Sequence, residues 1–426
     1  MPSVYFQASQ GADPAAERAA FAAAVLDSDL PGRDLFAAGT VLPTWMSLFR
    51  QLVAALPGEG PSIVVVDGLP WLVDADPMLE GTLQTAWDTV LAHKPVLLVL
   101  IGSDLAMMER LDDYRRPFHQ RGTVMVLPPL SPAEVGAMLS LPAAEAIDAY
   151  LVTGGLPLIC QEWLPGQSVE DFLAASLADP TSAILVSGER SLAAEFPGHL
   201  QAREVLAAIG NGERTWSSVR ATLSSAAEPM AASSLTNALR LLEAKRVVAV
   251  DTPLSAKPAE KDRRYRVADP YLRFYLAYLA AGLPLVERGR ADLLLRRIQR
   301  SWSAWRGRAV EPVIREALLR IAPELGWPEV EAVGGWWNRQ NNPEIDLVGA
   351  DRADAAHRIL FTGSIKWQTA KPFDRHDHAA LVRDTASAPG VDPATDLLAV
   401  SRSGVAPDVP LRSVGPDDLM AAWQPR

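Results

Sequence analysis

The sequence predicts a multidomain α/β protein with a parallel-sheet domain at the amino end, a helical segment, a winged helix and a second α/β domain at the carboxyl end. Three observations lead to this. Continuous apolar strands alternate with helical patterns in residues 1–130, which is typical of βαβ units. Three helical stretches precede a β-hairpin in residues 199–269, which is the order of a winged helix. In residues 309–426, strand patterns follow a helix.

Composition narrows the class of protein. Of the 426 residues, 49% are hydrophobic and 21% are charged, which excludes wholesale disorder. The net charge of −11 excludes a uniformly basic nucleic-acid coat but not a local basic patch. The single cysteine, Cys160, cannot form an internal disulfide. No apolar run approaches the ~20 residues of a membrane helix, and the start of the chain lacks the regions of a signal peptide. We therefore expect a cytoplasmic protein without a membrane segment.

Residues 1–130 supply the elements of the first domain in order. We expect strands at Val4–Ala8, 62–68, 95–103 and 123–130, and helices at Asp13–Leu26, Pro43–Leu56, Pro77–Ala92 and Asp104–Leu111. Asp13 suits the N-cap of its helix, and Pro14 suits the first turn. The second strand ends in Asp67, where open parallel sheets bind ligands, so it has the form of a Walker B strand whose aspartate meets Mg²⁺. An ordinary buried strand that ends in Asp is the alternative.

Two further candidates follow that strand. Ser103 ends the next strand, as the polar residue of a sensor strand would. Arg121 precedes the last expected strand, where an arginine can neutralise phosphate charge, although solvated surface is the alternative. A Walker A loop, GxxxxGK[ST], is absent, and no lysine follows a glycine. The chain thus opens on what would be the second strand of such a sheet, and the first strand, phosphate loop and first helix (roughly 30 residues) are missing.

The middle of the chain changes character twice. Residues 131–198 are expected to be mainly helical, with a GGLP turn at 154–157. The winged helix follows, with helices at Leu200–Ile209, Trp216–Leu223 and Ala232–Lys245 and strands at 246–251 and 263–269. An aromatic and basic connector spans 270–308. From Arg263 to Arg308 there are eleven arginines, no lysine and three acidic residues. Basic residues on a wing, here Arg263, Arg264 and Arg266, and on the following helix are what phosphate contact requires. DNA is therefore an expected partner; an interdomain helix with salt bridges to acidic neighbours is the alternative.

The carboxyl-terminal region carries a second group of candidates. After a helix at Ala309–Ile321, we expect strands at Glu331–Trp337, Ile345–Gly349, Arg358–Trp367 and Leu397–Val400. Glu311 on the helix, Asp346 on one strand and Lys366 on the next match the spacing by which restriction-type nucleases hold a metal ion. The acid expected two residues before the lysine is Ser364, which is a poor Mg²⁺ ligand. An ordinary amphipathic hairpin is the alternative.

Several motifs together resemble one known family. They are VYFQAS (4–9), IVVVDGLPWLVDADP (63–77), LIGSDLAMME (100–109), YRRPFHQR (114–121), LPPLSP (127–132), TGGLPL (153–158), RYRVADPYLRFYLAYL (264–279), GRAVEP (307–312), EIDLV (344–348) and GSIKW (363–367). They are similar to the archaeal-type ATPases of archaea and bacteria. In these, an AAA+/STAND-like nucleotide-binding module is followed by a winged helix and a restriction-endonuclease-like domain of unknown function.

The resemblance covers essentially the whole chain and implies its organisation. It implies a truncated P-loop-type ATPase core at 1–130, a helical lid at 131–198, a winged helix at 199–269, a basic connector at 270–308 and a restriction-endonuclease-like domain at 309–426. It also implies ATP and Mg²⁺ as cofactors, with Asp67 and Ser103 on the nucleotide side and Asp67 and Asp346 as metal residues. Arg121, Glu311 and Lys366 complete the catalytic candidates.

Three departures from the family bear on activity. The phosphate loop is absent, Gly68 stands where the family usually shows Glu, and Ser364 stands where an active nuclease has Glu. We therefore expect a DNA-associated regulatory or defence switch that hydrolyses ATP poorly or not at all. A metal-dependent nuclease of the PD-(D/E)xK type and a non-enzymatic winged-helix DNA-binding regulator are the alternatives. A protein partner or an oligomer is left open.

Overall fold

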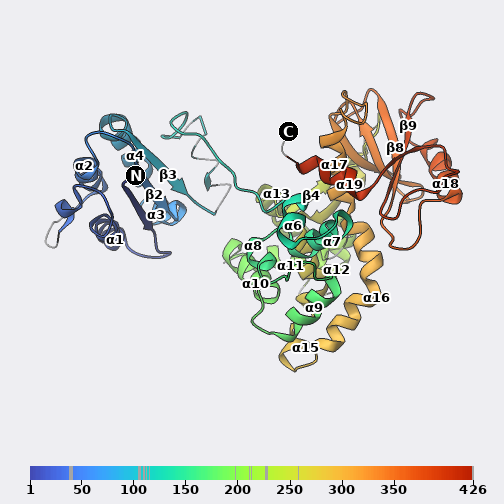
Figure 1. Cartoon of the computed structure of the whole chain (residues 1–426), viewed down its shortest axis with the longest axis horizontal. Helices are drawn as coiled ribbons and strands as arrows, with labels where there is room; N and C mark the ends of the chain where they lie inside the picture. Colours follow the sequence, from blue (N-terminus) through green and yellow to red (C-terminus); the bar gives the residue numbers. More distant parts are fainter. Residues whose placement is uncertain are drawn as a thin grey trace. The chain divides into compact units, whose positions relative to one another are not determined.

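The computed structural model describes residues 1–37, 42–103, 107–108, 111, 113–114, 116–196, 198–210, 212, 214–225, 229–257 and 259–424. The chain divides into two compact units, Met1–Val126 (unit 1) and Leu127–Arg426 (unit 2). Unit 1 is drawn in blue and unit 2 in green to red in Figure 1.

Unit 1 is built on a parallel sheet of order β1-β2-β3, which confirms the expected parallel arrangement. Its elements are β1 (Ser3–Gln7), α1 (Pro14–Leu26), η1 (Arg33–Phe36), α2 (Trp45–Ala55), β2 (Ser62–Asp67), α3 (Leu69–Ala75), α4 (Leu79–Ala86), η2 (Trp87–Leu91) and β3 (Val96–Ile101). Asp13 caps α1 as expected, accepting hydrogen bonds from the amides of Ala15 and Ala16. The helix expected over 104–111 lies partly outside the described residues.

Among the described residues of unit 1, the core packs on one face of the sheet. Val4, Phe6, Val64 and Val66 alternate inward and pack in one core with α1 and α2. The residues between them point to the other face, where Tyr5 is 55% and Leu97 58% exposed. Parallel sheets normally have both faces covered. In the described part of unit 1, β3 also pairs on one side only, with β2.

The prediction of a strand at 123–130 is wrong. These residues form no strand, and Met125 and Leu127 are 78% and 83% exposed. The run is apolar, as in a buried strand, but it pairs with no strand of the described residues. Instead, the amide of Leu130 donates to the carbonyl of Gly155 within unit 2.

Unit 2 begins with helices and continues into a small hairpin. Its first elements are α6 (Pro132–Leu139), α7 (Ala143–Thr153), α8 (Pro157–Cys160), α9 (Val169–Ala178), α10 (Ala183–Glu195), α11 (Leu200–Ile209), α12 (Trp216–Ser224), α13 (Ala232–Ala244), β4 (Val248–Asp251), η3 (Glu260–Asp262) and β5 (Arg264–Val267). β4 and β5 are antiparallel. Gly155, at φ +71°, lets the backbone of Leu130 approach so closely that a Cβ would not fit. The GGLP turn therefore joins the start of unit 2 to α7.

The second half of unit 2 contains a mixed five-stranded sheet. Its elements are α14 (Pro270–Phe274), η4 (Tyr275–Leu279), α15 (Leu283–Glu287), α16 (Ala291–Ala309), α17 (Glu311–Ile321), β6 (Ala332–Trp337), β7 (Glu344–Ala350), β8 (Ile359–Lys366), α18 (Arg375–Thr385), β9 (Asp396–Ser401), β10 (Arg412–Val414), α19 (Pro416–Met420) and η5 (Ala421–Trp423). The strand order is β10-β9-β8-β7-β6, antiparallel from β6 to β8 and parallel from β8 to β10. One hydrophobic core runs from α6 through the helices to β7, β8 and β9. Residues 127–426 therefore form one body.

No single helix of the described chain is long and apolar enough to cross a membrane; α6 and α7 reach that length and composition only as a pair bent by 106°.

Candidate functional site

Asp67 lies at the carboxyl end of β2, as the sequence predicts. The hydroxyl of Tyr5 on β1 donates to Oδ2 of Asp67 at 2.5 Å. This hydrogen bond is the main reason why the pKa of Tyr5 is raised. The carboxylate is thus already engaged by a protein donor.

The backbone conformation and the neighbours of Gly68, the residue after Asp67, leave no room for a side chain. Its φ is +79°, in the left-handed region that disfavours other residues. A Cβ there would lie 2.9 Å from the Trp71 ring and 3.2 Å from Cβ of Ala8. The absence of Glu is therefore built into the local backbone.

The other two candidates of unit 1 differ in their surroundings. Ser103 is exposed, two residues beyond the end of β3. Arg121 forms a bidentate ion pair with Asp88, with Nε–Oδ1 at 2.9 Å and Nη2–Oδ2 at 3.0 Å. Nη1 of Arg121 donates to the carbonyls of Pro117 and His119. Arg121 is therefore held by its own unit, and its predicted role at a phosphate has no support in these contacts.

In unit 2, Asp346 and Ser364 meet across β7 and β8. Oδ2 of Asp346 accepts from the Ser364 hydroxyl at 3.0 Å and from the amide of Ile365 at 2.8 Å. Burial raises the pKa of Asp346, while these two donors oppose the rise. The hydroxyl of Ser364 thus occupies the side of the carboxylate where the expected second acid would stand.

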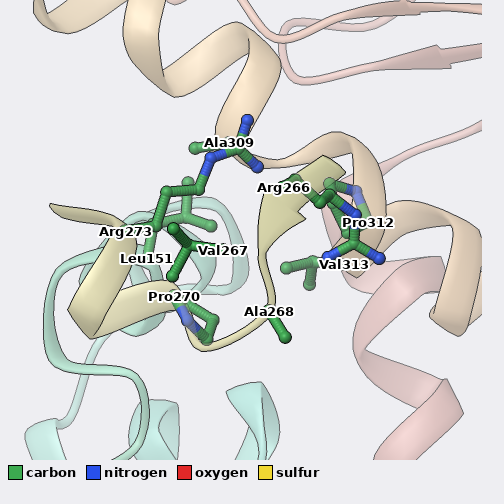
Figure 2. A pocket seen from close by; sticks show the side chains of 9 residues that line it. All are labelled: Leu151, Arg266, Val267, Ala268, Pro270, Arg273, Ala309, Pro312 and Val313. Atoms are coloured by element: carbon green, nitrogen blue, oxygen red, sulfur yellow. The ribbon is translucent and has the colours of Figure 1, made fainter. Parts of the chain in front are cut away.

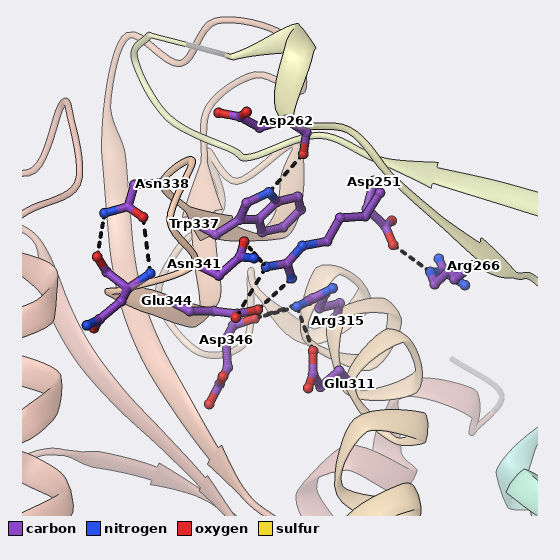
Figure 3. Close-up of polar contacts among 12 residues, drawn as sticks. Asp251, Asp262, Arg266, Glu311, Arg315, Trp337, Asn338, Asn341, Glu344 and Asp346 are labelled. Carbon is purple, nitrogen blue, oxygen red and sulfur yellow. Dashed lines mark hydrogen bonds and ion pairs between the residues drawn. The ribbon is translucent and has the colours of Figure 1, made fainter. Parts of the chain in front are cut away.

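The remaining nuclease candidates do not converge on that carboxylate. Arg315 donates to Oε2 of Glu311 at 3.0 Å and to the backbone carbonyl of Asp346 at 2.9 Å. Figure 3 shows Arg315 between Glu311 and Asp346, with the carboxylate of Asp346 turned away. Lys366 pairs instead with Asp377 on α18 at 3.1 Å. Within the described ranges, no three His, Cys, Asp or Glu side chains are grouped to hold a metal ion.

The expected DNA contacts on the wing are mostly intramolecular. Arg264 is 8% exposed and donates to Glu344 at 2.6 Å and to Asn341 at 2.8 Å. Its guanidinium also lies 4.0 Å from the ring centroid of Trp337. Figure 3 shows these three partners grouped at the ends of β6 and β7. The prediction that Arg264 contacts DNA is therefore contradicted, because the side chain is buried against the C-terminal sheet.

The rest of the hairpin supports this correction. Arg266 pairs with Asp251 at 2.7 Å across β4 and β5, whereas Arg263 is exposed. The amide of Leu254, in the loop between the strands, donates to the carbonyl of Gly335 on β6 at 2.9 Å. Leu254 itself is 5% exposed and packs with Trp336 and other apolar residues of the sheet. The β4–β5 hairpin and its loop thus pack against the C-terminal sheet.

Sequence reasoning missed a buried ionic cluster, which we call the Asp148 cluster. Asp148 on α7 accepts from Arg306 at 2.7 Å, from Arg402 at 3.1 Å and from Nε1 of Trp367 at 2.9 Å. Burial raises the pKa of Asp148, and the two arginines oppose the rise. The three donors come from α16 and from segments after β8 and β9, so no local pattern could reveal the cluster. It fixes α7 and α16 to the C-terminal sheet.

Sequence reasoning also missed an exposed face on α13. Ser233, Asn237, Arg240 and Ala244 are exposed, whereas Leu235, Leu239 and other apolar residues on the opposite side are buried. The spacing i, i+4, i+7 and i+11 places the four on one side of the helix. This signal was readable from the sequence.

Unit 2 has a small cavity and a wider groove. The cavity in Figure 2, about 20 Å³, is lined by Arg266, Arg273, Pro270, Pro312 and apolar neighbours, and it is large enough only for a water molecule or so. A wider groove of about 550 Å³ is lined by Tyr150, Trp423 and several prolines. The pair Glu316–Arg320, at 2.7 Å, lies on its lining.

Comparisons with known proteins match parts of the chain. Residues 275–378, from η4 into α18, match the family DUF234, described as "Archaea bacterial proteins of unknown function". An uncharacterized protein of Methanocaldococcus jannaschii is 25% identical over 319 residues, covering 73% of this chain and 69% of that protein. The structure of a Walker-type ATPase of Pyrococcus abyssi is 19% identical, covers 65% of this chain and 84% of its own, and has a TM-score of 0.45. The Aeropyrum pernix Orc1 protein in complex with DNA is 16% identical, covers 70% and 79%, and has a TM-score of 0.31.

Proposed function

We propose that this chain is an ATPase-family protein that acts as a DNA-associated regulator, contacts DNA through α13, and hydrolyses ATP weakly or not at all. The observation that carries the DNA proposal is the exposed face of α13. The polar residues of that face stand at the helix position that a winged helix places in the major groove.

The chemistry of this face suits base contact. Asn237 offers an amide that can bond an adenine edge, and Arg240 offers a fork that can bond a guanine. The side chain of Arg240 has no hydrogen bond or ion pair with any described residue. Ser233 and Ala244 are small, so the backbone of the helix can approach the groove. α11 packs against both α13 and α12, and α13 also packs against β4.

The residues present do not fit ATP–Mg²⁺ well. Asp67 is a single carboxylate engaged by Tyr5, and no glycine-rich loop with a lysine supplies donors for the phosphates. In the described residues of unit 1, Tyr5 and Leu97 are exposed on one face of the sheet, and β3 pairs with β2 alone. Without phosphate-loop donors, each worth roughly 1.5–3 kcal/mol, binding weakens by orders of magnitude. Calorimetry with ATP–Mg²⁺ should detect no binding below millimolar concentration; a micromolar dissociation constant would refute this part of the proposal.

The test for DNA uses sequence preference. The full chain should enrich a motif from a random duplex pool, and the double variant Asn237→Ala, Arg240→Ala should lose that preference. On the enriched duplex, the loss should be at least about tenfold in affinity, since each specific side-chain contact is worth ~1–3 kcal/mol. Arg352→Ala removes another exposed arginine, in the loop after β7, and should bind as the parent does. Unchanged preference in the double variant would remove α13 from the interface.

A metal-dependent nuclease is less well supported. Asp346 and Ser364 do meet, as the spacing predicts, but Lys366 and Glu311 are bound by Asp377 and Arg315. One carboxylate and a hydroxyl hold Mg²⁺ loosely. We therefore treat the C-terminal sheet as a structural part of the regulator.

A further inference from the structure

Helix α16 has two chemically different sides. Leu294, Ile298 and Trp305 are buried, and Arg306 turns inward to Asp148. The opposite side is exposed along the whole helix, which runs along the outside of unit 2 in Figure 1. The helix is 19 residues long, and most residues of this side are exposed.

Three arginines of that side lack acidic partners. Arg297, Arg300 and Arg308 are exposed, and none has a carboxylate within ion-pair distance in the described part of the chain. The local acid, Asp292, is taken by Arg290 at 3.1 Å and by Arg296 at 2.5 Å. We call Arg297, Arg300 and Arg308 the α16 stripe. At 100° per residue they fall within an arc of about 80° and span about 16 Å along the axis.

The residues between these arginines allow close approach. Ser303, Ala304 and Gly307 share the same side and are small. The phosphate backbone of a duplex can therefore lie along the helix, within reach of three guanidinium groups. In a chain of net charge −11, this local positive surface selects for a polyanion.

The same surface argues against a membrane. Interfacial helices bury bulky apolar side chains in the lipid. On α16 these side chains point inward: Trp305 is 5% exposed and stacks on Trp302, with ring centroids 5.4 Å apart. The exposed positions of α16 carry no bulky apolar side chain to insert.

We propose that the α16 stripe is a second DNA contact, which binds the phosphate backbone without regard to sequence. This rests on the proposed function, in which α13 reads the bases. The two surfaces then have separable signatures: α13 sets sequence preference, and the stripe sets the salt dependence of binding.

The experiment compares full-length variants on a labelled mixed-sequence duplex by fluorescence anisotropy. The triple variant Arg297→Ala, Arg300→Ala, Arg308→Ala should reduce the slope of log affinity against log salt by about 2.7, since each phosphate contact contributes about 0.9. From about 50 to about 200 mM salt, the parent should therefore lose about 40-fold more affinity than the variant. Replacing the same three by Lys keeps the charge and should keep most of the slope.

A matched control removes the same charge elsewhere. The triple variant Arg352→Ala, Arg375→Ala, Arg383→Ala lowers the net charge equally, at exposed sites around β7 and α18. It should keep the parent slope. If the stripe variant behaves like this control, the stripe is not a contact, even if α13 variants still lose sequence preference. If the stripe variant loses slope while α13 variants bind as the parent does, the stripe stands and the α13 assignment falls. Binding to phosphatidylserine vesicles without binding to duplex would overturn both.

Discussion

Replacing Arg264 by Ala tests whether the β4–β5 hairpin anchors the C-terminal sheet or contacts DNA. Its guanidinium is enclosed by Glu344, Asn341 and the ring of Trp337. The anchor interpretation predicts a loss of stability with DNA binding retained. A DNA contact predicts the reverse.

The size of the loss follows from the three partners. The Arg264 side chain is 10% and the Glu344 side chain 38% exposed, so solvent screens the ion pair, and we count it at ~1 kcal/mol. The stacking on Trp337 adds ~1 kcal/mol, and the hydrogen bond to Asn341 adds under ~1 kcal/mol. The sum is about 2–3 kcal/mol. With an unfolding entropy of about 2.1 cal/mol/K per residue over some 300 residues of unit 2, the melting temperature should fall by about 3–5 °C.

Calorimetry and anisotropy on the same preparations decide between the two interpretations. Arg264→Ala should melt lower and bind duplex as the parent does, and the swap Arg264→Glu with Glu344→Arg should recover part of the stability. Arg263→Ala, at the exposed neighbour, should not lower the melting temperature by more than ~1 °C. An Arg264→Ala protein that melts with the parent yet binds DNA more weakly would refute the anchor.

Three further changes test other parts of the structure. Gly68→Glu should lower the melting temperature without creating ATPase activity, since a left-handed non-glycine residue costs ~1–2 kcal/mol and Trp71 blocks the side chain; Gly58→Ala, in open space, is the control. The Asp374 pKa is lowered to about 2 by the amide of Asp377 and by Lys371, so its contribution to stability is present above about pH 4 and lost towards pH 2. Asp374→Asn should therefore melt with less pH dependence over this range. The parent should not cleave plasmid DNA in Mg²⁺ or Mn²⁺, whereas cleavage abolished by Asp346→Ala would show a working nuclease.

Local patterns predicted elements well where the pattern and the packing coincide. The strands around Val4–Ala8 and 62–68 are continuous apolar runs, and both are found in a parallel sheet. α18 was missed because its residues are mostly charged or His; its buried positions are Asp377, Leu381 and Thr385, so one apolar residue marks the inward face. At 123–130 the apolar run led to a wrong prediction of a strand, because an apolar run forms a strand only when it also pairs with a neighbouring strand.

Counting charges along the sequence gave wrong predictions at the candidate site, because such a count does not include ion-pair partners that are distant in sequence. Arg264 is neutralised by Glu344, 80 residues away, so a residue expected to contact DNA makes a contact within unit 2 instead. The role of Arg315 was missed for the same reason. Arg315 lies four residues from Glu311 in sequence, but its side chain also donates to the backbone carbonyl of Asp346 on β7. The spacing of Asp346 and Ser364 was readable because neighbouring strands bring such residues together directly.

In helix α16, arginines within twelve residues of one another have different roles, one buried in an ion pair and others exposed. Arg306 and Arg297 are alike in sequence context, since both lie in the basic connector, but burial separates them. Removing Arg306 would leave Asp148 buried with less compensation, a loss that costs about 3–5 kcal/mol when a buried pair is broken. Removing Arg297 from the exposed side should cost within about 0.5 kcal/mol, as for most surface substitutions. Stability therefore constrains the inward arginine, whereas Arg297, Arg300 and Arg308 are exposed and make no ion pair with the described residues, which is the observation behind the proposed phosphate contact.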